Sequence, residues 1–109
     1  MNKNSMVGGF DPINVTGIGE YSVKNEVLDE NSQRNLYLKG EKVFLVVNKN
    51  TIEVRTDDKL AKLLREKYES VMESRYFGRG GIEIVLAGEQ IPIDEIEDLV
   101  RLSYNMTEA

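Results

Sequence analysis

The side chains best suited to bind a partner lie in one short segment, residues 75–81, which reads R-Y-F-G-R-G-G. Arg75 and Arg79 flank the aromatic pair Tyr76 and Phe77, and a guanidinium fork matches the two oxygens of a carboxylate or a phosphate. The glycines of the segment would let such an anion approach the backbone closely. The simpler interpretation, which is the commoner one for a Gly-rich turn, is a helix-to-strand connection with glycines at positive φ, packed aromatics and solubilising arginines.

A second group of candidate contact residues comes from strands that we expect in the first half of the chain. Tyr37, Lys39 and Arg55 alternate with apolar residues, so they should share the side of a sheet that is turned away from the core. A sheet with helices on one side leaves its other side to solvent, which is the usual case, or to a partner. We therefore predict that a partner binds at Arg75, Tyr76, Phe77, Arg79, Tyr37, Lys39 and Arg55.

The composition argues against catalysis. The chain has neither cysteine nor histidine, which excludes disulfides, thiolate metal sites and any imidazole-dependent triad. Acid–base or nucleophilic chemistry would have to come from Asp, Glu, Lys or Tyr, and no pair of these stands apart from ordinary surface roles. We therefore expect no enzymatic activity, no catalytic residues, no cofactor and no metal site.

The net charge of −5 is concentrated near the C-terminus. From residue 82 onward the only basic side chain is Arg101, against Glu83, Glu89, Asp94, Glu95, Glu97, Asp98 and Glu108. Such a surface disfavours nucleic acid and favours a cationic partner or plain solubility, and the commoner explanation is a solvated helix face with carboxylates at its positive N-terminal end. Because the N-terminus lacks the apolar run of a signal peptide and no stretch could span a bilayer, we expect a cytoplasmic protein without membrane contact.

The hydrophobic patterning predicts one domain, which suits a chain of 109 residues. Residues 1–19 are rich in Gly and Asn without a period, so we expect a mobile or irregular arm, followed by a single α+β domain over residues 20–109. Period-two alternation from residue 20 to residue 55 predicts four strands joined by tight turns, with the apolar run 43–47 at the centre of the sheet.

In the second half of the chain the apolar residues recur with the period of a helix. Leu60, Leu63, Leu64, Tyr68, Val71 and Met72 form one stripe of a helix expected over residues 57–73, with Thr56 or Asp57 as its N-cap. Residues 82–86 read as a further strand, and Pro92 begins a last helix. The expected fold is α+β: an antiparallel, four- to five-stranded meander with two C-terminal helices packed on one face, in the order ββββ-α-β-α.

This order also assigns side chains to the two faces of the sheet. Towards the helices we expect Tyr21, Val23, Leu36, Leu38, Ile52, Val54, Ile82 and Ile84. Towards the other side we expect Ser22, Lys24, Glu26, Tyr37, Lys39, Thr51, Glu53, Arg55, Glu83 and Val85.

Three segments resemble motifs of the MmcQ/YjbR family of small bacterial proteins. Residues 40–46 (G-E-K-V-F-L-V) are similar to its G-K-M-F-A-L strand, and residues 58–68 (D-K-L-A-K-L-L-R-E-K-Y) to its D-P-E-L-A-x-x-L-R-E-x-Y helix. Residues 91–104 (I-P-I-D-E-I-E-D-L-V-R-L-S-Y) are similar to its L-P-D-E-x-I-x-x-L-I-x-x-S-Y helix, so the match covers about the last seventy residues. The resemblance implies a CyaY-like fold and the family's description as predicted DNA-binding double-wing proteins.

The chain departs from that family at two places. A Gly-rich arm stands where its members begin with an amphipathic helix, and residues 75–81 replace its Y-H-M-N-K-x-H-W segment. Three functional hypotheses follow: a small non-enzymatic binding module of the MmcQ/YjbR-like type that recognises a macromolecular partner, an acidic inhibitor or adaptor of the kind encoded by phages or mobile elements that docks on a basic host protein, and a nucleic-acid-binding protein. We favour the first, with a protein as partner.

Overall fold

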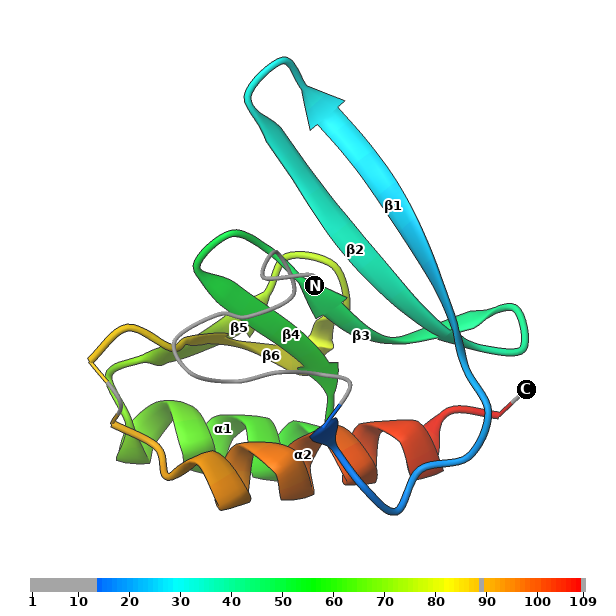
Figure 1. Cartoon of the computed structure of the whole chain (residues 1–109). Coiled ribbons are helices and arrows are strands. Elements are labelled where there is room, and N and C mark those ends of the chain that lie inside the picture. Colours follow the sequence, from blue (N-terminus) through cyan, green and yellow to red (C-terminus); the bar gives the residue numbers. More distant parts are fainter. Residues whose placement is uncertain (1–13, 89, 109) are drawn as a thin grey trace.

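Two helices cover one side of a six-stranded antiparallel sheet in the computed structural model of this chain, which describes residues 14–88 and 90–108 (Figure 1). The strands are β1 (Ser22–Asp29), β2 (Ser32–Lys39), β3 (Lys42–Val47), β4 (Thr51–Arg55), β5 (Val71–Ser74) and β6 (Gly78–Val85). The helices are α1 (Asp58–Lys67) and α2 (Ile93–Met106). The spatial order of the strands is β1-β2-β3-β4-β6-β5, which confirms the α+β class and adds one strand to the prediction.

The main core lies between the sheet and the helices. Ile52 and Val54 of β4 and Ile82 and Ile84 of β6 face the helices, as predicted, and all four are buried. They pack with Phe44 of β3 and with Ala61, Leu64, Ile96, Leu99, Val100 and Tyr104 of the helices. Burying apolar side chains of this size stabilises the fold by about 1.5–3 kcal/mol each, so this layer is the main source of stability.

Helix α1 is shorter than the periodicity predicts. It begins as expected, because the Asp57 side chain accepts a hydrogen bond from the Leu60 amide at 2.7 Å and caps the helix. It ends at Lys67, and Tyr68 is already extended. Val71 and Met72 therefore lie in β5, which pairs with β6 along the edge of the sheet. A strand there buries Val71 and pairs its backbone with β6, and a β-branched residue prefers a strand to a helix.

A β-bulge in β3 decides which way the β2 side chains point. Tyr37 lies opposite Leu45 and Leu38 lies opposite Val43, so Phe44 is an extra residue between the two pairs. Tyr37 consequently faces the helices with Phe44, whereas Leu38 faces the other side. The prediction that Leu36 and Leu38 point to the helices and Tyr37 and Lys39 point away is therefore wrong. Both alternating sets of β2 contain apolar residues, so its own pattern does not set the phase.

The side of the sheet without helices is covered in part. Leu36, Val43 and Val46 are buried there, and Leu38 and Phe77 pack against them as a second small core. Phe77 belongs to the turn between β5 and β6 (residues 75–77, the β5–β6 turn), which folds back over this side. The prediction of a hydrated outer face is thus wrong for Glu53 and Glu83, each only 1% exposed.

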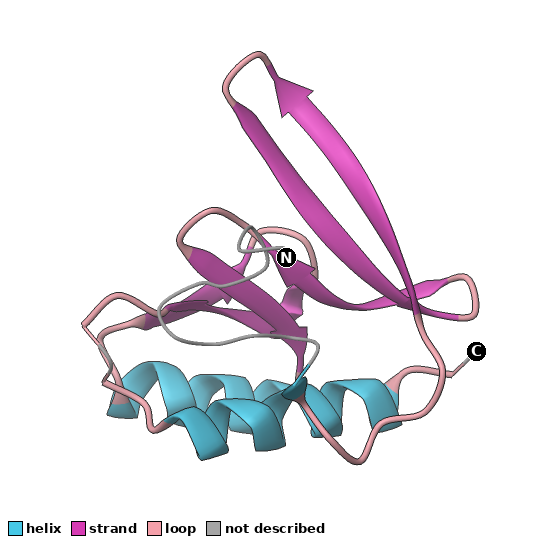
Figure 2. Cartoon of the chain, in the orientation of Figure 1, coloured by secondary structure: helices cyan, strands magenta, loops and turns pink. Residues whose placement is uncertain are grey.

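The end of the β1–β2 hairpin that carries its turn extends away from the rest of the sheet and from both helices (Figures 1 and 2). Val27, near this end, is 70% exposed, and Val23, at the opposite end of β1, is 50% exposed. Val23 was expected to face the core and does not contribute to it. The first described residues lie against α2 instead: Val15 is buried in the main core, and Arg101 donates a hydrogen bond to the Thr16 carbonyl.

The predicted N-terminal arm is described only from residue 14 onward, and its first thirteen residues lie outside the described part. Residues 15–19 form no strand or helix, and Val15 and Ile18 attach this segment to the core. Neither α1 nor α2, the helices of the described ranges, is long and apolar enough to cross a membrane.

Candidate functional site

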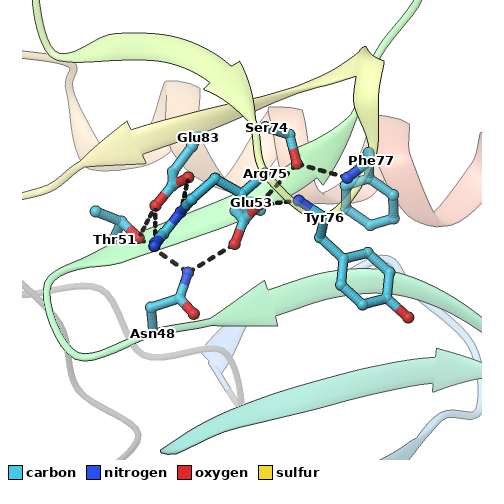
Figure 3. Close-up of polar contacts among 8 residues, drawn as sticks. All are labelled: Asn48, Thr51, Glu53, Ser74, Arg75, Tyr76, Phe77 and Glu83. Atoms are coloured by element: carbon cyan, nitrogen blue, oxygen red, sulfur yellow. Dashed lines mark hydrogen bonds and ion pairs between the residues drawn. The ribbon is translucent and has the colours of Figure 1, made fainter. Parts of the chain in front are cut away.

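Two buried glutamates lie side by side on the face of the sheet opposite the helices (Figure 3). Glu53 of β4 and Glu83 of β6 are direct cross-strand partners. Like charges in such positions destabilise a sheet, and a buried charge is costly unless it is hydrogen-bonded. Within residues 14–88 and 90–108 no group of three His, Cys, Asp or Glu side chains is placed to hold a metal. The partners of the two carboxylates must therefore come from neutral and basic groups nearby.

Glu53 holds the β5–β6 turn on the sheet. Its Oε1 accepts hydrogen bonds from the Ser74 hydroxyl at 2.7 Å and the Tyr76 backbone amide at 2.8 Å, and its Oε2 accepts one from Asn48 Nδ2 at 2.8 Å. The Ser74 hydroxyl in turn accepts from the Phe77 amide at 2.8 Å. Hydrogen bonds to a charged group stabilise by about 1.5–3 kcal/mol each, so this carboxylate organises the turn.

Glu83 is held by a bidentate arginine. Arg75 Nε donates to Oε1 at 3.0 Å and Nη2 donates to Oε2 at 2.6 Å, while the Thr51 hydroxyl donates to Oε2 at 2.7 Å. Burial by itself raises the pKa of Glu83, but the hydrogen bonds from Arg75 and Thr51 and the charge of the guanidinium outweigh it, so the pKa lies below its ordinary value. The hydrogen bond and the negative charge of Glu83 raise the pKa of Arg75.

Two arginines, one from β2 and one from β4, cover the aromatic residues of the turn. The Arg34 guanidinium lies 5.2 Å from the centre of the Tyr76 ring, and that of Arg55 lies 4.8 Å from the centre of the Phe77 ring. A Cβ atom at Gly81 would lie 2.6 Å from both the Val54 carbonyl oxygen and Phe77 Cβ. Gly81 therefore serves the close packing of Phe77, whereas the positive φ expected of these glycines is found at Gly78 (φ 67°). Arg79 is exposed on β6.

An open cleft of about 900 Å³ lies between the β1–β2 hairpin on one side and the β3–β4 turn with Arg75 on the other. We call it the hairpin cleft. Most of its polar lining consists of side-chain amides, and its basic groups are Arg34, Lys49 and Arg75. Among the described residues that line it, none is Asp or Glu. The amides are those of Asn25, Asn31, Gln33, Asn35, Asn48 and Asn50.

The structure separates the predicted contact residues into two groups. Arg75, Tyr76, Phe77 and Arg55 lie together on the side opposite the helices, with Arg79 nearby on β6. Tyr37 is 3% exposed in the main core, so it cannot form part of an exposed face. Lys39 is on the helix side, where Nζ donates to the Tyr104 carbonyl at 3.0 Å and lies 4.4 Å from the centre of that ring. The prediction that these two residues share a surface with the turn is wrong.

Several residues that shape the site were not predicted. Glu53 and Glu83 alternate with buried Ile and Val, which is the ordinary pattern of an exposed residue in an amphipathic strand, so no local signal marked them as buried. Arg34, Asn48 and Lys49 had no local pattern that set them apart.

Comparison with protein-family models, with curated proteins and with solved structures finds no match to this chain. The resemblance to the MmcQ/YjbR family therefore rests on the sequence motifs alone.

Proposed function

We propose that this protein is a non-enzymatic binding module whose hairpin cleft holds an extended, acidic segment of a partner protein. The observation that carries the proposal is the contrast between the cleft and the rest of the molecule. The chain has a net charge of −5, yet the described lining of the cleft has three basic side chains and no carboxylate. Basic groups in the cleft attract a negatively charged segment, and the net negative charge of the rest of the surface repels it.

The amide side chains suit a peptide backbone. Each Asn or Gln offers a carbonyl acceptor and two N–H donors, which matches the alternating donors and acceptors of an extended chain. Asn48 and Asn35 are held by hydrogen bonds to Thr51 Oγ1 and Asn25, both at 2.9 Å, so part of the lining is preorganised. Preorganised groups lose less side-chain entropy when a ligand binds.

Arg75 is the most suitable residue to meet an acidic side chain. Its side chain is 73% exposed although two of its nitrogens are bonded to Glu83. A guanidinium has five N–H donors in a fixed plane, so the edge turned to the cleft keeps donors for a second carboxylate. Glu83 thus fixes the orientation of the group that would contact the partner.

A nucleic-acid ligand, which the family resemblance suggests, is less well supported. A phosphate backbone that runs beyond the cleft would meet the surface of a chain whose net charge is −5. The face of the Tyr76 ring that could stack on a base is occupied by Arg34.

The test is a selection of random displayed peptides on the immobilised full chain, followed by affinity measurements of the enriched peptides at low and moderate salt. We expect enrichment of Asp and Glu, with binding that weakens as salt rises. Lys49→Glu, which reverses a charge at the cleft, should weaken binding about tenfold, since two exposed charge interactions change by about 1–2 kcal/mol together.

The matched control is Lys59→Glu, which makes the same change on the exposed surface of α1 and should leave affinity unaltered. If the enriched peptides carry no acidic bias, or if Lys49→Glu and Lys59→Glu behave alike, the hairpin cleft is not the binding site. Titration with labelled single-stranded and duplex DNA is run in parallel, and tight salt-dependent binding of DNA would replace the protein ligand with a nucleic acid.

A further inference from the structure

Strand β1 forms one edge of the sheet and is exposed along its length. It pairs with β2 on one side, and no strand of the described residues lies on its other side. Seven of its eight residues are exposed, including Val23, Val27 and Leu28. An edge strand of this length, without proline or glycine, offers a row of backbone N–H and C=O groups to a further strand.

The sequence of β1 is complementary to itself when it is read in the opposite direction. Residues 23–27 read V-K-N-E-V. If two copies pair in antiparallel register about Asn25, Val23 of one copy lies opposite Val27 of the other, and Lys24 lies opposite Glu26. Opposite charges and β-branched pairs in such positions stabilise a sheet, and each of these pairs occurs twice because the arrangement has two-fold symmetry.

We propose that the protein forms a dimer in which β1 pairs with β1 of a second copy about a two-fold axis at Asn25, joining the two sheets into one. The proposal does not depend on which ligand the hairpin cleft holds, although Asn25 lies both at the proposed axis and in the lining of the cleft. Lys24, which alone would protect an edge from pairing, becomes an attractive partner in this register. Glu26 already accepts from Arg34 at 2.6 Å, so its carboxylate lies between Arg34 and the Lys24 side chain of the second copy.

The position of the hairpin allows this contact. It extends away from the helical layer, so that a second copy reaches β1 without meeting α1 or α2 (Figure 2). Val23 and Val27, which are exposed in the monomer, gain neighbours across the new strand pair.

The first test uses the absence of cysteine from the chain. In Asn25→Cys the two thiols of a dimer lie directly opposite each other, at the separation of cross-strand partners, and mild oxidation should give a covalent dimer. In Val27→Cys the two thiols are four residues apart along the strands, about 13 Å, which is beyond the reach of a disulfide. We expect at least about tenfold faster cross-linking for Asn25→Cys than for Val27→Cys or for Lys59→Cys on α1.

The second test is the dimer dissociation constant from analytical ultracentrifugation. Lys24→Glu alone and Glu26→Lys alone each place like charges opposite one another and should raise the constant about tenfold or more. A mixture of the two variants restores both opposite-charge pairs across the dimer contact and should recover most of the lost affinity, although Glu26→Lys also removes the ion pair with Arg34. Circular dichroism checks that each variant is folded.

Either of two results would overturn the proposal: a chain that stays monomeric throughout its soluble range, or an Asn25→Cys variant that cross-links no faster than the controls. Dimers that are unaffected by Lys24→Glu, or assemblies that grow beyond a dimer, would also refute this register, because a two-fold contact closes on itself.

Discussion

Replacing Glu53 by glutamine tests whether this buried side chain anchors the β5–β6 turn. The carbonyl oxygen of the new glutamine could still accept from Ser74 and Tyr76, but its amide nitrogen would take the place of Oε2 and meet the Asn48 amide nitrogen, donor against donor. The variant loses one hydrogen bond to a charged acceptor and weakens two others. We expect the free energy of unfolding to fall by about 2 kcal/mol, a large part of the roughly 5–15 kcal/mol typical of a domain.

A double-mutant cycle makes this expectation specific. Asn48→Asp alone places a second carboxylate at the 2.8 Å contact with Glu53 and should destabilise the protein more than Glu53→Gln does. In the double variant the introduced glutamine amide donates to the introduced aspartate, so the loss should be smaller than the sum of the single losses by at least about 1 kcal/mol. Urea unfolding measures all four proteins, with an unchanged m value as the check on two-state behaviour.

The site-specific measurement is hydrogen exchange at the Tyr76 and Phe77 amides. Both should exchange faster in Glu53→Gln, since the turn opens more often, while amides of α1 keep their rates relative to global unfolding. Losses that add to within about 0.5 kcal/mol in the cycle would refute the contact between Glu53 and Asn48. Unchanged exchange at the turn would refute the anchoring role.

Three further predictions concern the two faces of the sheet. The pKa of Glu83 is lower in the folded than in the unfolded chain, so its stabilising contribution is complete above the unfolded pKa of about 4.3 and is lost as the pH falls through the folded pKa. The free energy of unfolding of Glu83→Gln should therefore decline less steeply in acid than that of the original chain. An identical decline would contradict this. Gly81→Ala should lower the free energy of unfolding in urea by about 1–3 kcal/mol, since its Cβ would lie 2.6 Å from a carbonyl oxygen. Gly80→Ala should be close to neutral, because the nearest atom to its Cβ would lie 3.9 Å away. Equal effects of the two variants would show that Phe77 does not pack as described. Ser103→Ala should lower the free energy of unfolding by about 2–4 kcal/mol, because the buried hydroxyl donates to the Phe44 carbonyl and accepts from the Arg55 amide at 2.8 Å. A loss below about 0.5 kcal/mol would mean that other groups form hydrogen bonds to this carbonyl and this amide.

The parts of the fold that follow from short-range pattern were predictable. The alternation of Ile52 and Val54, the apolar run 43–47, the Asp57 cap and the amphipathic last helix each have one arrangement that buries their apolar side. These elements give the class and the helical cover of one face.

What was not predictable depends on pairing between distant segments. The orientation of Tyr37 follows from a bulge at Phe44, and the strand at Val71 follows from the free edge of β6. Neither is encoded in a local period, because both orientations of β2 bury apolar residues and a short apolar run fits a helix or a strand.

The candidate site was predicted in part for the same reason. Arg75, Tyr76 and Phe77 were predicted from their residue types. Their role on the sheet depends on Glu53, which is far from them in sequence, and on Glu83, which lies on β6. A glutamate between two apolar β-branched residues is typical of the exposed side of an amphipathic strand. Only the turn folded over it makes the position buried.

The hairpin cleft as the site for an acidic segment is tested most directly by NMR titration of the full chain with an oligo-glutamate peptide, using an oligo-lysine peptide as the control. The proposal predicts salt-sensitive shifts with oligo-glutamate at the side-chain amides of Asn25 and Asn48, at the backbone amide of Lys49 and at Arg75 Nε, with α1 and α2 unchanged. Shifts concentrated on α1 or α2, or an equal response to oligo-lysine, would contradict it.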